Sequence, residues 1–360
     1  MQITKMNKFG LLTAVILVAA LVLTSCSGIN INKDSGKISI VTTIFPSYDF
    51  AREIIGDENA DIKMLLKPGS EAHSYEPTPQ DIIAIQNCDV FVYVGGESDE
   101  WVKNILSSVD TSEISIVSMM DCVDAVEEEI VEGMQAELSD DHDHSGSHED
   151  KHDENPHTDM EEPDTDFEET PDSDDDGAYE PEYDEHVWTS PLNAIKIVQS
   201  ISEAIVEKDL SNAEYYQKRT QDYVQKLTEL DNEFRDVVNN AKIRTIIFGD
   251  RFPCRYFADE YGLKYYAAFP GCSSETEASA KTVSFLIDKV NDEGIPVVLY
   301  PELSNKKVAT TICESTGAKY MQFNSCHNVT NDEFENGVSY LSLMQENVKV
   351  IEEALNDEAR

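Results

Sequence analysis

Short apolar runs alternate with amphipathic stretches along most of the chain. The first run, Ile38–Ile44, precedes a stretch in which apolar residues recur at helical spacing through Phe50, Ile54 and Ile55. The same order of strand and helix repeats as far as about Val117. Continuous apolar strands that alternate with helices are typical of a mostly parallel sheet covered on both faces. The pattern therefore predicts an α/β lobe in the first part of the chain.

A second series of the same kind occupies the last third of the sequence. Its predicted strands are "RTIIFG", "KYYAAF", "PVVLYPE" and "KYMQFN", and the series ends in a helix from Val338 to Leu355. We therefore expect an α/β fold of two similar lobes with mainly parallel sheets. In open sheets of this kind ligands bind at the carboxyl ends of the strands, and a cleft between two lobes is the natural site.

A long helix is predicted between the two series. Ser211 can cap it, and an apolar face persists for about 30 residues, or about 45 Å at 1.5 Å per residue. The positions of that face are Tyr216, Tyr223, Leu227, Leu230 and Phe234. Such a helix can act as a rigid strut that joins the lobes. The predicted parts are an N-terminal lobe at 38–210, a linking helix at 211–241 and a C-terminal lobe at 242–360.

The first residues have the features of an export signal. Lys5 and Lys8 precede an apolar run, Phe9–Leu23, which ends in the lipobox "LTSC" at Cys26. Cleavage before Cys26 and a lipid on its thiol would tether the mature chain to a membrane. An uncleaved anchor is the alternative, but this run of 15 residues is shorter than the roughly 20 that span a bilayer. We expect residues 1–26 to be a lipoprotein signal peptide and the rest to lie outside the cytoplasmic membrane.

Residues 127–185 interrupt the alternation. Asp, Glu, His, Ser and Pro dominate this segment, and the lack of large apolar side chains predicts a disordered insertion. Neutral imidazoles among acids can bind Zn²⁺ in many transient combinations. The segment is therefore an expected auxiliary, low-affinity metal loop, which could collect metal, buffer or sense it, or be a solvated insertion without function. Its five histidines are His142, His144, His148, His152 and His157.

The charge of the chain excludes one class of partner. The formal net charge is −44, with 71 acidic residues against 27 lysines and arginines. A nucleic-acid phosphate backbone needs a basic surface that this composition does not supply. Metal cations are better matched partners, although most surface acids serve only to keep a protein soluble.

Six cysteines remain if Cys26 carries a lipid, and none of them forms a CxxC pair. A structural zinc knuckle is therefore not expected. In an exported protein disulfides persist, so a bridge such as Cys272–Cys326 is one reading. Buried free thiols are the other.

Three histidines fall in the parts of the sequence predicted to fold, and each lies beside the end of a predicted strand or helix. They are His73, His186 and His327. Asp250 and Glu302 each end a strand of the second series, so they should meet at one edge of that sheet. Imidazoles with one carboxylate suit Zn²⁺, whereas an oxygen-rich set of ligands suits Mn²⁺ or Mg²⁺. Either carboxylate could instead cap a helix.

Four segments carry a family resemblance, in this order: "PGSEAHSYEPTPQDI", "DEHVWTSP", "FGDRFPCRYFADEYGLKYYAAFPGCSSETEAS" and "NSCHNVT". They resemble the metal-binding lipoproteins of ABC transporters, in the zinc-uptake branch of the cluster A-I solute-binding proteins. The resemblance runs from about Ile38 to Leu355, and a His-rich acidic insertion before "DEHVW" is itself typical of that branch.

The resemblance implies a set of metal ligands. The first family histidine corresponds to His73 and the second to His186. The third ligand, usually His or Glu, corresponds to Asp250, and the fourth, usually Asp, meets Asn324, which is a poor ligand. His327, three residues further on, could take the fourth place. Glu302 is the alternative carboxylate.

The resemblance also implies a function. The chain would be a lipid-anchored monomer that captures Zn(II) between its lobes and delivers it to a membrane permease, with the long helix limiting hinge motion. A manganese-type protein of the same family is the alternative, since only the count of histidines favours zinc, and a metal-binding adhesin or surface lipoprotein is a further one. An enzyme is not expected, because neither HExxH nor GxSxG occurs in the sequence.

Overall fold

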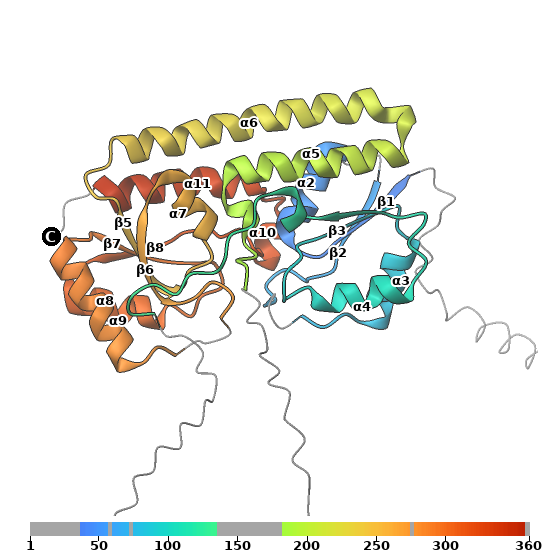
Figure 1. Cartoon of the computed structure of the whole chain (residues 1–360). Coiled ribbons are helices and arrows are strands. Elements are labelled where there is room, and N and C mark those ends of the chain that lie inside the picture. The colour runs from blue at the N-terminus through green and yellow to red at the C-terminus, as the bar shows by residue number, and fades with distance from the viewer. Residues whose placement is uncertain (1–36, 57–59, 72–74, 135–181, 274–276, 357–360) are drawn as a thin grey trace, which may run out of the picture.

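Parallel strands form the centre of each of two lobes (Figure 1). The computed structural model describes residues 37–56, 60–71, 75–134, 182–273 and 277–356. In both lobes the first strand of the sequence is the second in the sheet, with orders β2-β1-β3-β4 and β6-β5-β7-β8. The predicted α/β fold of two similar, mainly parallel lobes is confirmed.

The strands of the N-terminal lobe are β1 (Ile38–Thr42), β2 (Ala60–Met64), β3 (Val90–Tyr93) and β4 (Ser115–Ser118). Those of the C-terminal lobe are β5 (Thr245–Arg251), β6 (Lys264–Phe269), β7 (Val297–Tyr300) and β8 (Lys319–Gln322). Every residue of β1 and β7 is buried. Burial on both faces is the reason that β7 is a continuous apolar run and that β1 contains only small polar residues, Ser39 and Thr42, among its apolar ones.

The helices of the N-terminal lobe are α2 (Phe45–Ile55), α3 (Pro79–Asn87), α4 (Glu100–Ser108) and α5 (Pro191–Lys208). The C-terminal lobe contains α7 (Arg255–Tyr261), α8 (Ala280–Glu293), α9 (Lys307–Thr316), α10 (Asn331–Glu335) and α11 (Tyr340–Asn356). None of the helices in the described ranges is long and apolar enough to cross a membrane.

Helix α6 (Ala213–Asn239) crosses both lobes along one side of the molecule (Figure 1). It packs on α5 and α2 at one end and on α11 and α7 at the other. Its buried face contains all five apolar positions predicted for it. The predicted cap is wrong, because Ser211 lies in a short 3₁₀ turn, Leu210–Asn212, where its hydroxyl bonds to Asp209. The helix begins only after this turn.

The ends of the predicted insertion are ordered. Glu127 and Tyr183 form an antiparallel bridge, and the backbone N–H of Asp184 donates to the carbonyl of Val126 (3.0 Å). The prediction of disorder is therefore wrong for residues 127–134 and 182–185, because backbone pairing joins the two ends and Val131 and Met134 pack against the hydrophobic core. Residues 135–181, which contain all five histidines of the auxiliary loop, lie outside the described residues.

The last helix returns to the N-terminal lobe. The backbone N–H of Tyr340 donates to Oδ2 of Asp49 in α2 (2.7 Å), and the Tyr340 hydroxyl donates to the carbonyl of Trp188 (2.7 Å). Arg52 pairs with Asp49 and donates to the carbonyl of Val338 (2.9 Å). One hydrophobic cluster consequently runs through both lobes.

The buried carboxyl of Asp49 should make the free energy of unfolding depend on pH. Burial raises its pKa to about 6 from 3.8, although the charge of Arg52 and the bond from Tyr340 act in the opposite direction. Between these values the folded state binds more protons than the unfolded state, so this contribution is present below pH 4 and lost as pH rises through 6. Relative to Asp49→Asn, the free energy of unfolding of the wild type should fall by on the order of 2–3 kcal/mol between pH 4 and 7.

Urea unfolding of wild type and Asp49→Asn across this pH range measures the difference between their free energies of unfolding. The contributions of the other acidic groups cancel in this difference. The exposed Asp222→Asn variant is the control, and its difference from wild type should vary by less than about 0.5 kcal/mol. A wild-type minus Asp49→Asn difference that is flat with pH would contradict the prediction.

Candidate metal site between the lobes

A pocket lies between the lobes at the carboxyl ends of the strands of the C-terminal lobe. Its volume is about 40 Å³, which holds an ion with a few waters but not an organic solute that needs several hundred Å³. Ser70 and Glu71 line it from the N-terminal lobe, and His186 lies at the lobe boundary. The C-terminal lobe supplies Arg251, Pro253, Gly271, Pro301, Glu302, Leu303, Ser325, His327 and Asn328.

His186 is the most constrained side chain of the pocket. It directly precedes a 3₁₀ turn, Val187–Thr189, and is fully buried. Oδ1 of Asp184 accepts from the backbone N–H of His186 (2.8 Å) and lies 3.1 Å from its Nδ1. A carboxylate at this nitrogen favours the tautomer with hydrogen on Nδ1 and the lone pair on Nε2, which is the usual arrangement behind a metal-binding histidine.

The charges around His186 act on its basicity. Burial alone lowers the pKa of its imidazole, but the Asp184 carboxylate and its hydrogen bond raise it, and Glu185 and Glu128 add to the rise. The net direction is a raised pKa. A basic, oriented imidazole is a stronger donor to a metal ion.

His327 lies against His186. The centroids of the two rings are 5.3 Å apart, and the Trp188 ring is 5.0 Å from that of His327. The indole N–H of Trp188 donates to the carbonyl of Ser325 (2.7 Å), which fixes the loop of His327 to the turn that carries His186. The structure therefore brings two of the predicted ligands together.

Glu302 holds the same loop from the other side. Its carboxylate accepts from the backbone N–H of Ser325 (2.6 Å), the Ser325 hydroxyl (2.7 Å) and the backbone N–H of His327 (2.8 Å). Burial raises the pKa of this carboxyl, while the bonds from Ser325 and His327 lower it. Glu302 lines the pocket and does not cap α9, whose N-cap is Lys306.

Replacing Glu302 by glutamine is expected to weaken metal binding by about 10-fold or more, since groups that orient a ligand typically matter to that extent. The amide carries one acceptor oxygen in place of two, so one of the three donors loses its partner. Titration of the purified chain with Zn²⁺ in competition with a chelator measures the change. Glu314→Gln, at an exposed position of α9, should retain wild-type affinity, and an equal loss in both variants would argue against this role.

Asp250 does not line the pocket. Its oxygens accept from the Ser304 hydroxyl and from the backbone N–H of Arg251 (2.8 Å). The register of β5 against β6 shifts between Phe248 and Arg251, so Arg251 faces the pocket instead. The sequence prediction assumed a regular strand, and a shift of one residue reverses which side chain points to a site. Asp250 does not cap α7 either, because the N-cap is Cys254.

His73 lies outside the described residues, as does Cys26, but the loop before His73 is fixed. Gly69 donates its N–H to the carbonyl of Val329 (2.7 Å), and the Asn328 amide donates to the carbonyls of Lys67 (2.9 Å) and Ser70 (2.8 Å). This loop of the N-terminal lobe is therefore fastened across the cleft to the segment that follows His327.

Asn324, which stands at the fourth position of the family pattern, is occupied elsewhere. Its side-chain oxygen accepts from the Gln322 amide (2.7 Å), and its backbone N–H and carbonyl bond to the side chain of Asn347 in α11 (2.8 and 2.7 Å). Asn324 is buried and does not line the pocket.

Sequence reasoning missed Asp184 and Gly271. Asp184 orients His186 and lies two residues before it, so the signal is the acidic residue at the start of "DEHVW". A Cβ at Gly271 would lie 2.8 Å from the carbonyl oxygen of Phe252 and 3.3 Å from Cε1 of His186. The glycine is thus required by the close approach of this loop to the histidine.

The sequence left open whether the cysteines form a disulfide or remain free thiols. All six that the structure describes are free, including Cys272 and Cys326. The bridge between these two is therefore absent, and the reading as free thiols holds. Most of them are buried in the lobes.

The fold and the pocket together define a two-lobed binding protein with a small site for an ion. A model of the zinc-uptake complex component A family, described as periplasmic, matches residues 40–354. The high-affinity zinc uptake system protein ZnuA of Bacillus subtilis is 30% identical over 351 residues, which are 94% of each chain. The chain belongs to this family.

Two further matches agree with the assignment to this family. The zinc-binding lipoprotein AdcA of Streptococcus pneumoniae is 28% identical over 353 residues, and this chain spans 62% of its length. The crystal structure of the metal-dependent lipoprotein YcdH from Bacillus subtilis superposes with a TM-score of 0.67 at 27% identity, covering 89% of this chain and all of that one. The names of these relatives are those of a zinc uptake protein, a zinc-binding lipoprotein and a metal-dependent lipoprotein, and none of them is the name of an enzyme.

Proposed function

We propose that the chain is the extracytoplasmic component of an ABC transporter, which captures Zn(II) between its lobes and delivers it to a membrane permease. The observation that carries the proposal is the pair of neighbouring imidazoles, His186 and His327, in a pocket of ionic size. Zn²⁺ is the common metal for imidazole ligands completed by a carboxylate.

The proposed ligand set is His73, His186 and His327, with Glu302 as the carboxylate in preference to Asp250. His73 is included because the loop that leads to it is fastened beside the pocket. Glu302 is preferred because it lines the pocket, whereas Asp250 does not. Three imidazoles with one carboxylate favour Zn²⁺ over Mn²⁺, which prefers oxygen ligands.

The location and attachment are part of the same proposal. A lipid on Cys26 would hold the chain, as a monomer, at the outer face of the cytoplasmic membrane, close to the permease. The auxiliary loop with His142, His144, His148, His152 and His157 would raise the local zinc concentration. The names of the relatives, a lipoprotein and uptake proteins, support this arrangement.

Titration calorimetry of the mature chain with Zn²⁺, Mn²⁺ and Ca²⁺ tests the choice of metal. We expect one tight zinc site in the nanomolar range, which corresponds to about −12 kcal/mol, and weaker manganese binding. Tight manganese binding with weak zinc binding would replace the proposal by the manganese alternative. No tight binding of zinc or manganese would favour an adhesin or surface lipoprotein.

Delivery to a permease needs a separate measurement. Cells that lack the chain should accumulate little zinc from a chelated medium, and restoring the wild-type chain should restore uptake. Zinc uptake that is unchanged by loss of the chain would contradict delivery even if binding is tight.

A further inference from the structure

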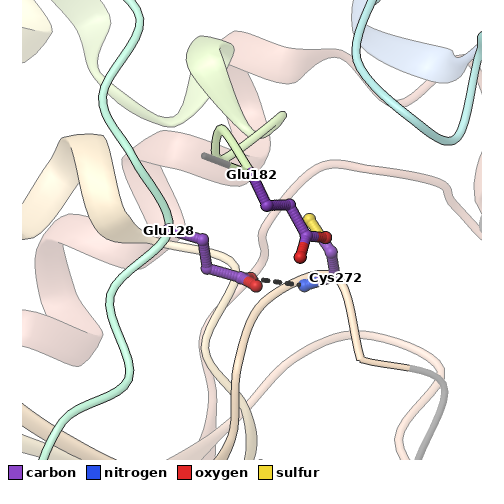
Figure 2. A group of neighbouring side chains, drawn as sticks. All are labelled: Glu128, Glu182 and Cys272. Atoms are coloured by element: carbon purple, nitrogen blue, oxygen red, sulfur yellow. Dashed lines mark hydrogen bonds between the residues drawn. The ribbon is translucent and has the colours of Figure 1, made fainter. Parts of the chain in front are cut away.

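Three side chains that can bind metal converge outside the interlobe pocket. Glu128 and Glu182 lie near the two ends of the segment 127–185, and Cys272 follows β6. One ligand atom of each, a carboxylate oxygen or the thiol sulfur, lies within 4.8 Å of the other two. Figure 2 shows the two carboxylates and the thiol gathered around one point. We call these residues the Glu-Glu-Cys cluster, and none of them lines the pocket.

The backbone around the cluster fixes its geometry. The N–H of Glu128 donates to the carbonyl of Glu182 (2.9 Å), next to the bridge of Glu127 with Tyr183. The carboxylate of Glu128 also accepts from the backbone N–H of Cys272 (2.9 Å; Figure 2). These bonds tie three separate segments together. The convergence is therefore built into the fold and is not a chance approach of long surface side chains.

The mixture of donors indicates the kind of ion. Carboxylates alone are common on a protein surface, and Ca²⁺ and Mg²⁺ take oxygen ligands. A thiol among two carboxylates suits a softer ion, and Zn²⁺ accepts both sulfur and oxygen. Ligand atoms around a tetrahedral zinc ion are about 3.5 Å apart, given bonds of about 2.3 Å to sulfur and 2.1 Å to oxygen. The ligand atoms of the cluster lie within 4.8 Å of one another, so binding of a tetrahedral ion would draw them together by about 1 Å.

We propose that Glu128, Glu182 and Cys272 bind a second Zn(II) ion beside the interlobe site. A Cβ at Gly271, the residue before Cys272, would lie 3.3 Å from Cε1 of His186, and Asp184 follows Glu182 by two residues. The second site thus adjoins the first, near the C-terminal end of the segment 127–185. Its use as a transfer position for zinc rests on the proposed function, whereas the binding itself does not.

Cobalt(II) is the probe that tests the cluster, because a thiolate bound to cobalt gives a charge-transfer band in the near ultraviolet that imidazole and carboxylate ligands do not give. The full mature chain is used under reducing conditions, so that all thiols are available. We expect the band in the wild type and in Cys122→Ser, which removes a half-buried thiol elsewhere. We expect its loss in Cys272→Ser.

The carboxylates and the main site supply the controls. Glu182→Gln, at an exposed position, should weaken cobalt binding followed at this band by about 10-fold or more. Glu127→Gln removes the same charge one residue from Glu128 and should leave the affinity unchanged. In His186→Ala the band should persist although tight zinc binding at the interlobe site is lost. Binding at the Glu-Glu-Cys cluster would then be independent of the interlobe site.

Three outcomes overturn the proposal. The first is a wild-type chain without the band, and the second is a band that survives Cys272→Ser. The third is a band lost in both Cys272→Ser and His186→Ala, because Cys272 would then bind the ion of the interlobe site rather than a second one.

Discussion

Replacing His186 by alanine is expected to weaken zinc binding by more than about 100-fold. The side chain is fully buried at the pocket, and its ring is held by Asp184 and packed beside His327. A lost ligand should cost more than a lost orienting group, which typically costs 10- to 100-fold in metal affinity. Competition with a zinc chelator of known affinity, followed at constant pH, measures the change.

Two variants separate this effect from others. Asp184→Asn keeps His186 and removes only the charge at its Nδ1, so it should fall in the 10- to 100-fold range. His152→Ala removes a histidine of the auxiliary loop and should leave the tight site unaltered. An affinity of His186→Ala within a few-fold of wild type, in a protein with a wild-type circular dichroism spectrum, would exclude His186 as a ligand.

Replacing Phe234 by alanine is expected to lower the free energy of unfolding by about 3–5 kcal/mol. Phe234 lies in the half of α6 that covers the C-terminal lobe and is fully buried. Its ring packs edge-on against Phe257 (4.9 Å between centroids) and near Tyr261 (5.4 Å), both in α7. The substitution leaves a cavity between a helix that crosses both lobes and the lobe that supplies most of the pocket.

Urea unfolding followed by circular dichroism measures this loss. Glu233→Ala, at the preceding and exposed position of the same helix, should change the free energy of unfolding by no more than about 0.5 kcal/mol. If Phe234→Ala changed stability as little as Glu233→Ala does, the packing described for α6 would be wrong.

The order of strands and helices could be predicted because the inner strands of both sheets are mostly buried and apolar. β1 and β7 show this directly, since every residue of each is buried. The start of α6 could not be predicted in the same way. Ser211 is a good capping residue, but its hydroxyl bonds to Asp209 within the preceding turn. The preference of serine for the N-cap was overridden because the Asp209 carboxylate accepts from its hydroxyl, a contact that the spacing of apolar residues does not reveal.

The site was predictable in part, for a physical reason that β5 illustrates. Histidines at strand and loop ends indicate where ligands meet, and His186 and His327 do lie together. Asp250 and Arg251 exchange roles because the register of β5 shifts near its end. A one-residue irregularity in a strand leaves no clear mark on the sequence, and it decides which side chain enters the pocket.

The roles of Glu302 and Asp184 depend on contacts rather than on position. Glu302 was expected either to bind metal or to cap a helix; it lines the pocket rather than capping α9, and its carboxylate also accepts three hydrogen bonds from the loop of His327. Those donors are more than 20 positions away in the sequence. Only the folded chain shows that these two carboxylates hold the histidines in place.

The return of α11 to the N-terminal lobe has a consequence for how the molecule is made. Tyr340 packs edge-on against Phe50 of α2 (4.9 Å between centroids) and bonds to the carbonyl of Trp188. Until synthesis reaches this residue, the apolar faces of α2 and α6 lack part of their cover. The first lobe therefore cannot complete its core ahead of the second, and a chain truncated before α11 would expose that surface to proteases and to aggregation.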